Sequence, residues 1–421
     1  MHILVVGAGF AGLGAARRLA QDPEVEVTLV DQRNHHLFQA LLYQVATAGL
    51  SAGEIASPVR SLFRNHSRVK VLMAELTGLD APQRLAHFDH GRLEVKYDAL
   101  LLCLGAVTSY FGHPEWEAHA PGLKSLEEAL ALRHRFLEGL ERAEKCSDAE
   151  QRKPWMTVGI IGGGPTGVEL AGAFAELCRQ VLARDYRNIN TEQARVVLIE
   201  GGPRVLAAFP EALSRAAQRD LQALGVEVWL EERVQDIGPG YLRTQHRQLE
   251  AHTLVWSAGV RPHPLAQQLD LPLTSQGRLL VNPGLQVEGH PDIFCAGDLA
   301  GACDDAGLPL PAMAPVAIQA GPWAADNALR HLRGQPLRPF RYQDSGLMAT
   351  VGRSRGVAVL GQRQLTGWKG WLTWLWHHLL RIVDRQNRAL VLSRWIWAYF
   401  TWKWGVRLIQ GAAGPEARSK P

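Results

Sequence analysis

The stretch that decides the fold is residues 2–31, HILVVGAGFAGLGAARRLAQDPEVEVTLVD. Its apolar, β-rich start at residues 2–7 predicts a buried parallel strand, and residues 13–20 predict the helix that follows. A second apolar run, residues 25–30, predicts another strand that ends at Asp31. This order of strand, glycine turn, helix and strand predicts an α/β fold built on a parallel sheet.

Three glycines in the turn, which reads GAGFAG, are typical of a dinucleotide site. Gly7 permits the tight turn, Gly9 lets a pyrophosphate approach the backbone, and Gly12 lets the helix pack close to the strand. The helix N-terminus offers N–H donors to phosphates, and Asp31 would accept hydrogen bonds from ribose hydroxyls. An ordinary glycine turn in a βαβ unit is the alternative, but the complete pattern favours a nucleotide site.

The same pattern occurs again 155 residues further along the chain, with Gly162 in the place of Gly7. The second copy consists of a strand at 157–161, the turn GGGPTG at 162–167, an amphipathic helix at 168–182 and a strand at 196–199. Glu200 ends that strand, and its carboxylate would repel the 2′-phosphate of NADPH, which favours NADH. Arg204 follows four residues later and could in principle reach such a phosphate.

Further segments fill the chain between and after the two turns. Strands are predicted at 68–76, 99–104, 253–256 and 293–296, and helices at 127–145 and 313–330. Gly105 and the turn at Ala258 and Gly259 each follow a strand, where a glycine lets the backbone pass beside a cofactor. Asp298 would either bind a ribityl hydroxyl or cap a helix, and both interpretations fit the local sequence.

The composition of the 421 residues, 47% hydrophobic and 20% charged, predicts a folded chain of two or three domains. A net charge of +4 gives no reason to expect nucleic acid as a partner. The five scattered cysteines argue for a reducing compartment and against a disulfide scaffold or thiol redox centre, and no metal site is expected. Since the first strand begins at His2 and apolar runs are short, we expect neither a signal peptide nor a membrane-spanning helix.

The C-terminal segment contains eight of the thirteen tryptophans. Helical spacing predicts an apolar stripe formed by Trp368, Trp371, Leu372, Leu375, Leu379, Ile382 and Val383. A second aromatic segment, residues 390–409, contains Trp395, Trp397, Tyr399, Phe400, Trp402 and Trp404. Basic residues are interleaved, at Arg381, Arg385, Arg388, Arg394, Lys403 and Arg407. Tryptophan with basic residues predicts an in-plane membrane anchor, and a dimer interface or a helix packed on the core is the alternative.

Taken together, these segments give the chain a resemblance to the type II NADH dehydrogenases, the NADH:quinone oxidoreductases among flavoproteins with two dinucleotide-binding domains. The specific pieces are residues 7–12, 35–49 (HHLFQALLYQVATAG), 162–172 (GGGPTGVELAG), 294–298 (FCAGD) and the tryptophan-rich tail. The LLYQVAT segment and the tail separate this family from glutathione and ferredoxin reductases. The lack of a cysteine pair after Gly12 argues against disulfide reductases and sulfide:quinone reductases.

The resemblance implies two Rossmann-like dinucleotide-binding domains and a C-terminal amphipathic helical region that binds the membrane. It divides the chain into residues 1–120 (FAD-binding, first part), 121–270 (NADH-binding), 271–345 (FAD-binding, second part) and 346–421 (membrane association). FAD would contact Gly7, Gly9, Phe10, Ala11, Gly12, Asp31, Gly105, Asp298, Ala317 and Ile318. NADH would contact Gly162, Gly164, Pro165, Thr166, Gly167, Glu200, Ala258 and Gly259.

The resemblance also gives two residues candidate catalytic roles. Glu169 matches the family's glutamate between nicotinamide and flavin, where a buried carboxyl would have a raised pKa and relay protons to the quinone. The alternative for Glu169 is a first-turn carboxylate that interacts with the helix dipole. Gln319 would hydrogen-bond a quinone carbonyl or is a plain helix residue. Pro315 stands where many members carry a first glutamine, so the role of that glutamine does not transfer.

The implied reaction passes electrons from NADH through FAD to a membrane quinone without proton pumping. The protein would lie peripherally on the cytoplasmic face of the plasma membrane, and a homodimer is compatible with the tail. Two alternatives stay open: a flavoprotein reductase for a soluble acceptor, and a non-enzymatic redox sensor that binds nucleotides.

Overall fold

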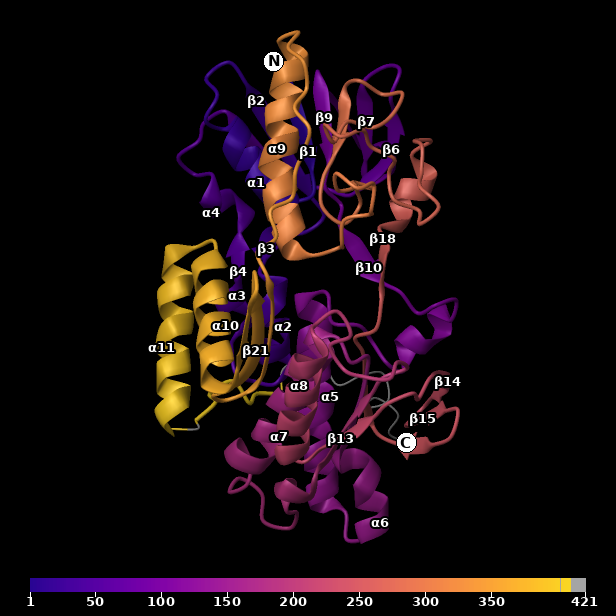
Figure 1. The fold of residues 1–421 in the computed structure, drawn as a ribbon, viewed down its shortest axis with the longest axis vertical. Helices are drawn as coiled ribbons and strands as arrows, with labels where there is room; N and C mark the ends of the chain where they lie inside the picture. The colour runs from indigo at the N-terminus through magenta and orange to yellow at the C-terminus, as the bar shows by residue number, and fades with distance from the viewer. Residues whose placement is uncertain (402, 410–421) are drawn as a thin grey trace, which may run out of the picture. The chain divides into compact units, whose positions relative to one another are not determined.

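The protein, in a computed structural model that describes residues 1–401 and 403–409, forms two compact units (Figure 1). Unit 1 comprises residues 1–37, 56–107 and 260–345, and unit 2 comprises residues 38–55, 108–259 and the chain from 346 onward. The chain crosses between the units five times, and two of these crossings lie at β10 (Ala106–Thr108) and β18 (Val260–Pro262). Residues 38–55, expected in the first domain, thus belong to the unit that contains the tail.

Unit 1 is built on a five-stranded sheet in which every pairing is parallel. Its strand order is β19 (Ile293–Cys295), β9 (Ala99–Leu102), β1 (His2–Val6), β2 (Glu26–Asp31) and β5 (Val69–Met73). Two helices, α1 (Phe10–Leu19) and α9 (Ala314–Leu332), pack against the sheet and against each other. They cross closely because Gly321 has no side chain; a Cβ there would overlap the carbonyl oxygen of Ala11. The predicted order of the first βαβ pattern is confirmed.

Smaller elements complete unit 1. They are the antiparallel sheet β6 (Leu76–Asp80), β7 (Leu85–Phe88) and β8 (Leu93–Lys96), the pair β3 (His35–Leu37) and β4 (Ala56–Pro58), and helix α4 (Val59–Leu62). The single strand predicted over residues 68–76 is wrong, because the chain divides between β5 and β6 in different sheets. The Glu75 amide donates to the Asp89 carboxylate at 2.9 Å, which turns the chain away from the first sheet.

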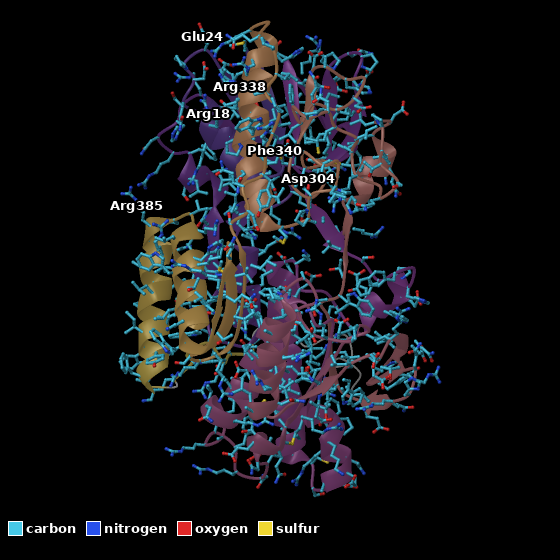
Figure 2. The ribbon with its side chains drawn as sticks, viewed as in Figure 1. Arg18, Glu24, Asp304, Arg338, Phe340 and Arg385 are labelled. Atoms are coloured by element: carbon cyan, nitrogen blue, oxygen red, sulfur yellow. The ribbon has the colours of Figure 1, made fainter. Side chains whose placement is uncertain are left out.

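Ion pairs tie the last helix of unit 1 to the segments around α1. Arg18 lies 2.7 Å from Asp326, and Arg333 binds both Asp22 (2.7 Å) and Glu24 (3.0 Å). Arg18 and Glu24 are labelled in Figure 2. The exposed pair of Arg18 and Asp326 contributes little stability, about 0–1 kcal/mol, whereas Asp22, which pairs with Arg333, is a buried carboxylate.

Unit 2 is built on a four-stranded parallel sheet of mostly apolar strands, in which Thr157 and Thr253 are also buried. Its order is β13 (Val226–Trp229), β12 (Arg195–Ile199), β11 (Thr157–Ile161) and β17 (Thr253–Trp256). Three longer helices and a short one belong to it: α5 (Leu126–Lys145), α7 (Pro165–Glu176), α8 (Glu211–Ala223) and α6 (Ala149–Arg152). An antiparallel sheet consists of β14 (Val234–Gly238), β15 (Tyr241–Thr244) and β16 (Gln248–Glu250). Helix α5 starts with a capping box between Ser125 and Glu128, which satisfies two free backbone amides.

The C-terminal part of unit 2 adds a three-stranded sheet and two helices that lie side by side, the first of them packed on the sheet (Figure 1). They are β20 (Leu347–Gly352), β21 (Arg355–Leu360), β22 (Arg363–Thr366), α10 (Gly367–Arg381) and α11 (Arg385–Thr401). The short helices α2 (Leu42–Ala46) and α3 (Ala52–Ile55) complete the unit, and α3 binds α11 through a salt bridge of 3.0 Å between Glu54 and Arg394. Figure 2 shows Arg385 projecting from the start of α11.

Helix α7 differs from its prediction as an amphipathic helix over residues 168–182. Every residue from 167 to 176 is buried, because β20 packs on the helix where Gly172 leaves room for the Val351 carbonyl. A helix covered on all sides carries no polar stripe. Beyond Glu176 the chain continues as one π-helical turn, Leu177–Val181.

The C-terminal helices also differ in detail from the predicted apolar stripe. Leu379 faces inward, whereas Trp368 and Leu372 of the same stripe are 58% and 46% exposed. The largest inward side chain is Trp374, at 1% exposure. The second aromatic segment is helical only to Thr401, and Trp402 lies outside the described residues. Among the helices described, none combines the length and apolarity that a bilayer crossing demands.

Candidate active site

The first glycine turn joins β1 to α1 in unit 1 and has the geometry of a dinucleotide cradle. Gly7 adopts a φ of 100°, and a Cβ at Gly12 would overlap the Gly7 carbonyl oxygen, so both positions require glycine. Space around Gly9 is open, with no atom within 4 Å of a Cβ built there. The Asp31 carboxylate accepts from the amides of Ala8 (2.6 Å) and Arg33 (2.7 Å), which fixes it at the edge of the turn.

The second glycine turn, in unit 2, repeats these features residue by residue. Gly162 has a φ of 110°, and a Cβ at Gly167 would overlap the Gly162 carbonyl oxygen. Gly164, like Gly9 in the first turn, has open space around it. Glu200 accepts from the Gly163 amide at 2.6 Å and from the amide two residues beyond itself at 2.7 Å. The two turns therefore share one construction, with a strand-end carboxylate bound to the turn.

Several residues predicted to line the first cofactor converge in unit 1. A Cβ on Gly297 would lie 3.3 Å from the Ala11 Cβ and 3.5 Å from the Ala317 Cβ. These residues come from the start of α1, the end of β19 and the first turn of α9, which thus lie close together. In the sequence, Phe10 precedes Ala11, Ile318 follows Ala317, and Asp298 follows Gly297. Gly105 follows β9 with a φ of 71° and open space around it.

A cavity of about 110 Å³ lies beside the strand-end carboxylate of unit 1. Asp31 and Asn34 line it from β2 and the following turn, and Val59 and Arg60 line it from α4. It combines an apolar wall from β5 with polar groups at its edge, which suits a base and a ribose.

The residues around the second turn lie close to neighbouring backbone and ring atoms. Pro165 and Thr166 form the first residues of α7, and Gly162 lies so close to the next strand end that a Cβ would be 2.8 Å from the Ala258 nitrogen. Gly259 has a φ of 76° and lies under the Phe111 ring.

Arg204 does not extend toward the second turn. Its guanidinium donates to the carbonyl oxygens of Ala207 (2.7 Å) and Phe209 (2.7 Å) and to the Ser214 hydroxyl (3.0 Å). The side chain thus stabilises its own loop, which leaves Glu200 as the charged group at the strand end. This arrangement favours NADH and disfavours the Arg204 alternative.

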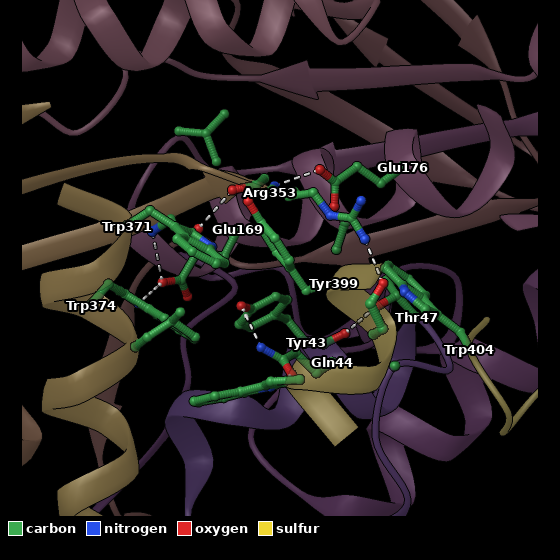
Figure 3. A pocket seen from close by; sticks show the side chains of 18 residues that line it. Tyr43, Gln44, Thr47, Glu169, Glu176, Arg353, Trp371, Trp374, Tyr399 and Trp404 are labelled. Atoms are coloured by element: carbon green, nitrogen blue, oxygen red, sulfur yellow. Dashed lines mark hydrogen bonds between the residues drawn. The ribbon is translucent and has the colours of Figure 1, made fainter. Parts of the chain in front are cut away.

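A second cavity, of about 120 Å³, lies entirely within unit 2 (Figure 3). Helix α7 forms one wall with Glu169, Ala173 and Glu176, and indole rings from α10 and α11 form another, among them Trp374 and Trp395. Helix α2 closes it with its aromatic and polar side chains, and the turn after β20 borders it as well. Six of the eighteen residues that line the cavity are thus aromatic, and two carboxyl groups lie in its wall.

Glu169 is buried, as the sequence predicts, with 8% of its surface exposed. Burial raises its pKa to about 8, and two hydrogen bonds oppose this rise: the Trp374 indole donates to Oε1 at 2.8 Å, and the Thr350 amide donates to the same oxygen at 3.4 Å. Because α7 begins at Pro165, Glu169 lies beyond the first turn of the helix. The dipole alternative is therefore disfavoured, and the side chain contacts the C-terminal segment instead.

Gln319, the second catalytic candidate, lies in unit 1 on α9 and uses its whole amide group locally. Its Nε2 donates to the Gln343 carbonyl at 2.9 Å, and its Oε1 accepts from the Gln343 amide at 3.0 Å. The side chain thus fastens the segment after the helix to α9. Glu169 and Gln319 belong to different units. Pro315 occupies the first turn of α9, where proline is compatible with the helix.

Some residues of these sites have no assigned role in the sequence interpretation. His36 is buried, its Nδ1 lies 2.8 Å from the Ala8 carbonyl, and burial lowers its pKa to about 4, so a neutral imidazole holds the first turn. Tyr43 and Glu176 line the unit 2 cavity. The signals existed: His36 and Tyr43 fall in the quoted segment 35–49, and Glu176 follows Glu169 by seven residues.

Comparisons with known proteins agree with this construction. The family model described as pyridine nucleotide-disulphide oxidoreductase matches residues 1–321. The type II NADH:quinone oxidoreductase Ndh of Mycobacterium tuberculosis is 37% identical over 412 residues, covering 94% of this chain and 87% of that protein. The demethylphylloquinone reductase NdbB of Synechocystis is 32% identical over 407 residues, covering 94% and 95%.

A solved structure shows the same fold. The structure of NDH2 from Plasmodium falciparum in complex with NADH aligns with a TM-score of 0.86 over 97% of this chain and 99% of that chain, at 19% identity. The fold and the paired turns define a two-dinucleotide oxidoreductase. The chain belongs to the pyridine nucleotide-disulphide oxidoreductase family and, within it, to the type II NADH:quinone oxidoreductases. The predicted family is confirmed.

Proposed function

We propose that this chain is an FAD-dependent NADH:quinone oxidoreductase that holds FAD on the first glycine turn and NADH on the second. The observation that carries the proposal is the repetition of one cradle, with Asp31 and Glu200 each bound to the second residue of its turn. The relatives named for quinone reduction, at 37% and 32% identity over most of the chain, support quinone as the acceptor. They favour this function over a reductase for a soluble acceptor and over a redox sensor.

The residues of unit 1 fit a bound FAD. Open space at Gly9 and the N-terminus of α1 would receive the pyrophosphate, and the cavity beside Asp31 would receive the adenosine half. The first turn of α9, with Ala317, would lie along the flavin, where its N–H groups favour negative charge. When bound, FAD supplies the two-electron chemistry that protein side chains lack.

The residues of unit 2 fit NADH in the same manner. Gly164 has the open space that a pyrophosphate needs, and Glu200 would accept hydrogen bonds from the ribose hydroxyls. Ala258 and Gly259 would border the nicotinamide half. The Glu200 charge opposes a 2′-phosphate, and Arg204 is engaged by its own loop, so we expect a preference for NADH.

We assign Glu169 a role in proton transfer, and we keep Gln319 as a candidate for hydrogen bonding to the quinone. A carboxyl group with a pKa of about 8 is mostly protonated at neutral pH and can donate a proton during quinone reduction. A hydrogen bond from Gln319 to a quinone would require that one of its two bonds to Gln343 be exchanged. The acceptor reaction as proposed moves no charge across a membrane.

We further propose that α10 and α11 attach the protein to the cytoplasmic face of the membrane, where NADH and a reducing environment are found. Exposed aromatic rings support this: Trp376 is 65% exposed, Trp397 56% and Phe400 78%. Arg385 and Lys403 add positive charge on the same segment, as expected for an interfacial helix. A second copy of the chain is the competing occupant of this face.

Surface substitutions test the attachment better than deletion of the tail, because the buried Trp374 is part of the unit 2 core. Trp376→Ser combined with Phe400→Ser should lower vesicle binding about a hundredfold, since two large side chains account for roughly 3 kcal/mol. Leu308→Ser, at a site that is 63% exposed in unit 1, is the matched control. Unchanged vesicle binding together with a shift from dimer to monomer would replace the membrane by a second copy.

Steady-state oxidation of NADH with a short-chain quinone tests the proposed activity. We expect quinone-dependent turnover in purified protein that contains FAD. Turnover with a soluble protein acceptor but not with quinones would favour the first alternative. NADH binding without turnover on any acceptor would favour a redox sensor.

A further inference from the structure

The unit 2 cavity contains a second buried carboxyl group that the proposed function does not use. Glu176 lies seven residues after Glu169 on α7, so both side chains leave the same face of the helix, about 10 Å apart along its axis. Both line the same cavity, and each is 8% exposed. Buried glutamates are rare unless they are paired or functional, and two on one helix face require a reason.

A backbone amide of the C-terminal sheet holds the Glu176 carboxyl group in the cavity wall. Its Oε1 accepts from the Arg353 backbone amide at 2.6 Å, at the turn between β20 and β21. The Arg353 guanidinium donates to the Ala398 carbonyl and lies 4.8 Å above the Tyr399 ring. Burial raises the pKa of Glu176 to about 7, with the charges of Arg353 and Arg355 acting in the opposite direction.

Tyr43 couples the two carboxyl groups across the cavity. It is fully buried on α2, and its phenol accepts a hydrogen bond from the Gln44 amide at 2.8 Å. Burial raises its pKa, and the charges of Glu169 and Glu176 both raise it further, so the phenol lies within electrostatic reach of each. Figure 3 shows Tyr43 among the side chains that surround the cavity, with Glu169 and Glu176 on its helical wall.

The cavity provides the remaining link between the two groups. Its volume of about 120 Å³ has room for about four water molecules at roughly 30 Å³ each. Since Glu169 and Glu176 are about 10 Å apart along the helix axis and no hydrogen bond joins them, the phenol and such waters are the groups available to connect them. The π-helical turn that begins directly after Glu176 is of a kind that occurs often at functional sites.

The reaction requires a proton from solvent. NADH, quinone and one proton give NAD⁺ and quinol: the C4–H bond of NADH breaks and supplies two electrons and one proton as hydride. The two quinone oxygens gain two protons in total, so the second proton comes from water. A group that binds this proton near neutral pH is therefore needed beside the acceptor reaction.

We propose that Glu176 binds this solvent proton and passes it through the unit 2 cavity, past Tyr43, to Glu169. The inference rests on the proposed function for the identity of the reaction. The groups that face Glu176 are Arg353 and Arg355 from the C-terminal sheet, Tyr43 from α2, Tyr399 from α11 and Glu169 from its own helix. In this proposal Glu176 affects the reaction only by delivering the proton to Glu169, so it is a positioning residue and not a catalytic one.

Glu176→Gln separates this role from a structural one, because the glutamine oxygen still accepts from the Arg353 amide. We expect the kcat for quinone reduction at pH 8 to fall at least tenfold and the solvent isotope effect on kcat to rise. The limb of the pH profile near pH 7 should disappear. FAD content and the rate of flavin bleaching by NADH should stay unchanged, and Glu176→Asp should restore part of the rate. The exposed Glu192→Gln is the matched control.

A Glu176→Gln protein with the wild-type kcat, pH profile and isotope effect would overturn the proposal. If that variant does not fold, infrared difference spectra of the wild type decide the question: they should contain two carboxyl bands that titrate near pH 7 and pH 8. One band, or none, would overturn the proposal. Failure of the wild type to reduce quinone would reject the proposed function instead, and the infrared titration does not depend on that result.

Discussion

The helices that follow the two glycine turns begin alike and differ in what they bury. Helix α1 buries only apolar residues and glycine, and packs on α9. Helix α7 starts from the same turn geometry but buries Glu169 and Glu176 against the C-terminal sheet and helices. Both copies therefore have the nucleotide cradle. Of the two helices, only α7 buries acidic side chains.

This difference indicates a division of labour. In the proposed function, the strand-end carboxylates Asp31 and Glu200, each bound to a backbone amide of its turn, recognise a ribose. A carboxyl group kept in an aromatic cavity changes its protonation near neutral pH, and it requires a cover, which the residues after 346 provide. The C-terminal segment thus forms part of the core around α7.

The largest expected effect is the pH dependence of stability that Glu169 adds to unit 2. Its folded pKa of about 8 exceeds the ordinary value of 4.5, so the folded state binds the proton more tightly and stability falls as the pH rises between these values. The loss is at most about 5 kcal/mol, at about 1.4 kcal/mol for each pKa unit. Glu169→Gln should remove this fall, as urea unfolding at pH 5 and pH 9 would show.

Glu192→Gln, a surface change in the same unit, should leave the wild-type slope intact. If the free energy of unfolding depends on pH equally in the wild type and in Glu169→Gln, then the burial of Glu169 on α7 does not carry the expected free-energy cost.

Matched glycine substitutions test whether the two turns are equivalent. Gly12→Ala should abolish FAD retention, and Gly167→Ala should weaken NADH binding at least a hundredfold while FAD stays bound. The reason is that each new methyl group would overlap a backbone carbonyl oxygen, at a cost of about 3 kcal/mol. Flavin absorbance and NADH titration measure the two results. Gly53→Ala, a position with open space, is the control; normal binding in both variants would refute the shared construction.

Trp374→Phe tests the cover over α7. Loss of the indole donor removes a hydrogen bond of 2.8 Å to Glu169, which is worth about 1.5 kcal/mol when the acceptor is charged. The pKa of Glu169 should rise by about one unit, and the alkaline limb of the quinone reductase profile should move up with it. An unmoved limb would mean that this carboxyl does not control the rate.

Glu200→Gln should produce the smallest effect. Removing the charge at the second strand end should improve the kcat/KM for NADPH about tenfold, corresponding to about 1.4 kcal/mol, while the kcat/KM for NADH falls modestly. Arg204→Ala should not change this ratio, because the arginine holds its own loop. A loss of NADPH activity in Arg204→Ala would restore the alternative that the sequence left open.

Local patterns predicted the parts of the molecule that are made from contiguous residues. The strand, turn, helix and acid of each copy follow from glycine spacing and apolar runs, and β11 and β17 have the predicted bounds. The burial of α7 on all sides was not predictable, because residues 347–352 that cover it lie far along the chain. The same holds for the hydrogen bonds between Gln319 and Gln343 and for the break between β5 and β6. Both depend on contacts between residues that are far apart in the sequence, which local periodicity does not reveal.

Anaerobic spectroscopy of the purified protein gives the most direct measurement. Addition of NADH to the yellow protein should bleach the flavin absorbance, and subsequent addition of a short-chain quinone should restore it with one equivalent of quinol formed. A colourless protein, or a flavin that NADH does not bleach, would contradict the assignment of the two turns. A flavin that bleaches but is not restored by quinone would contradict the proposed acceptor.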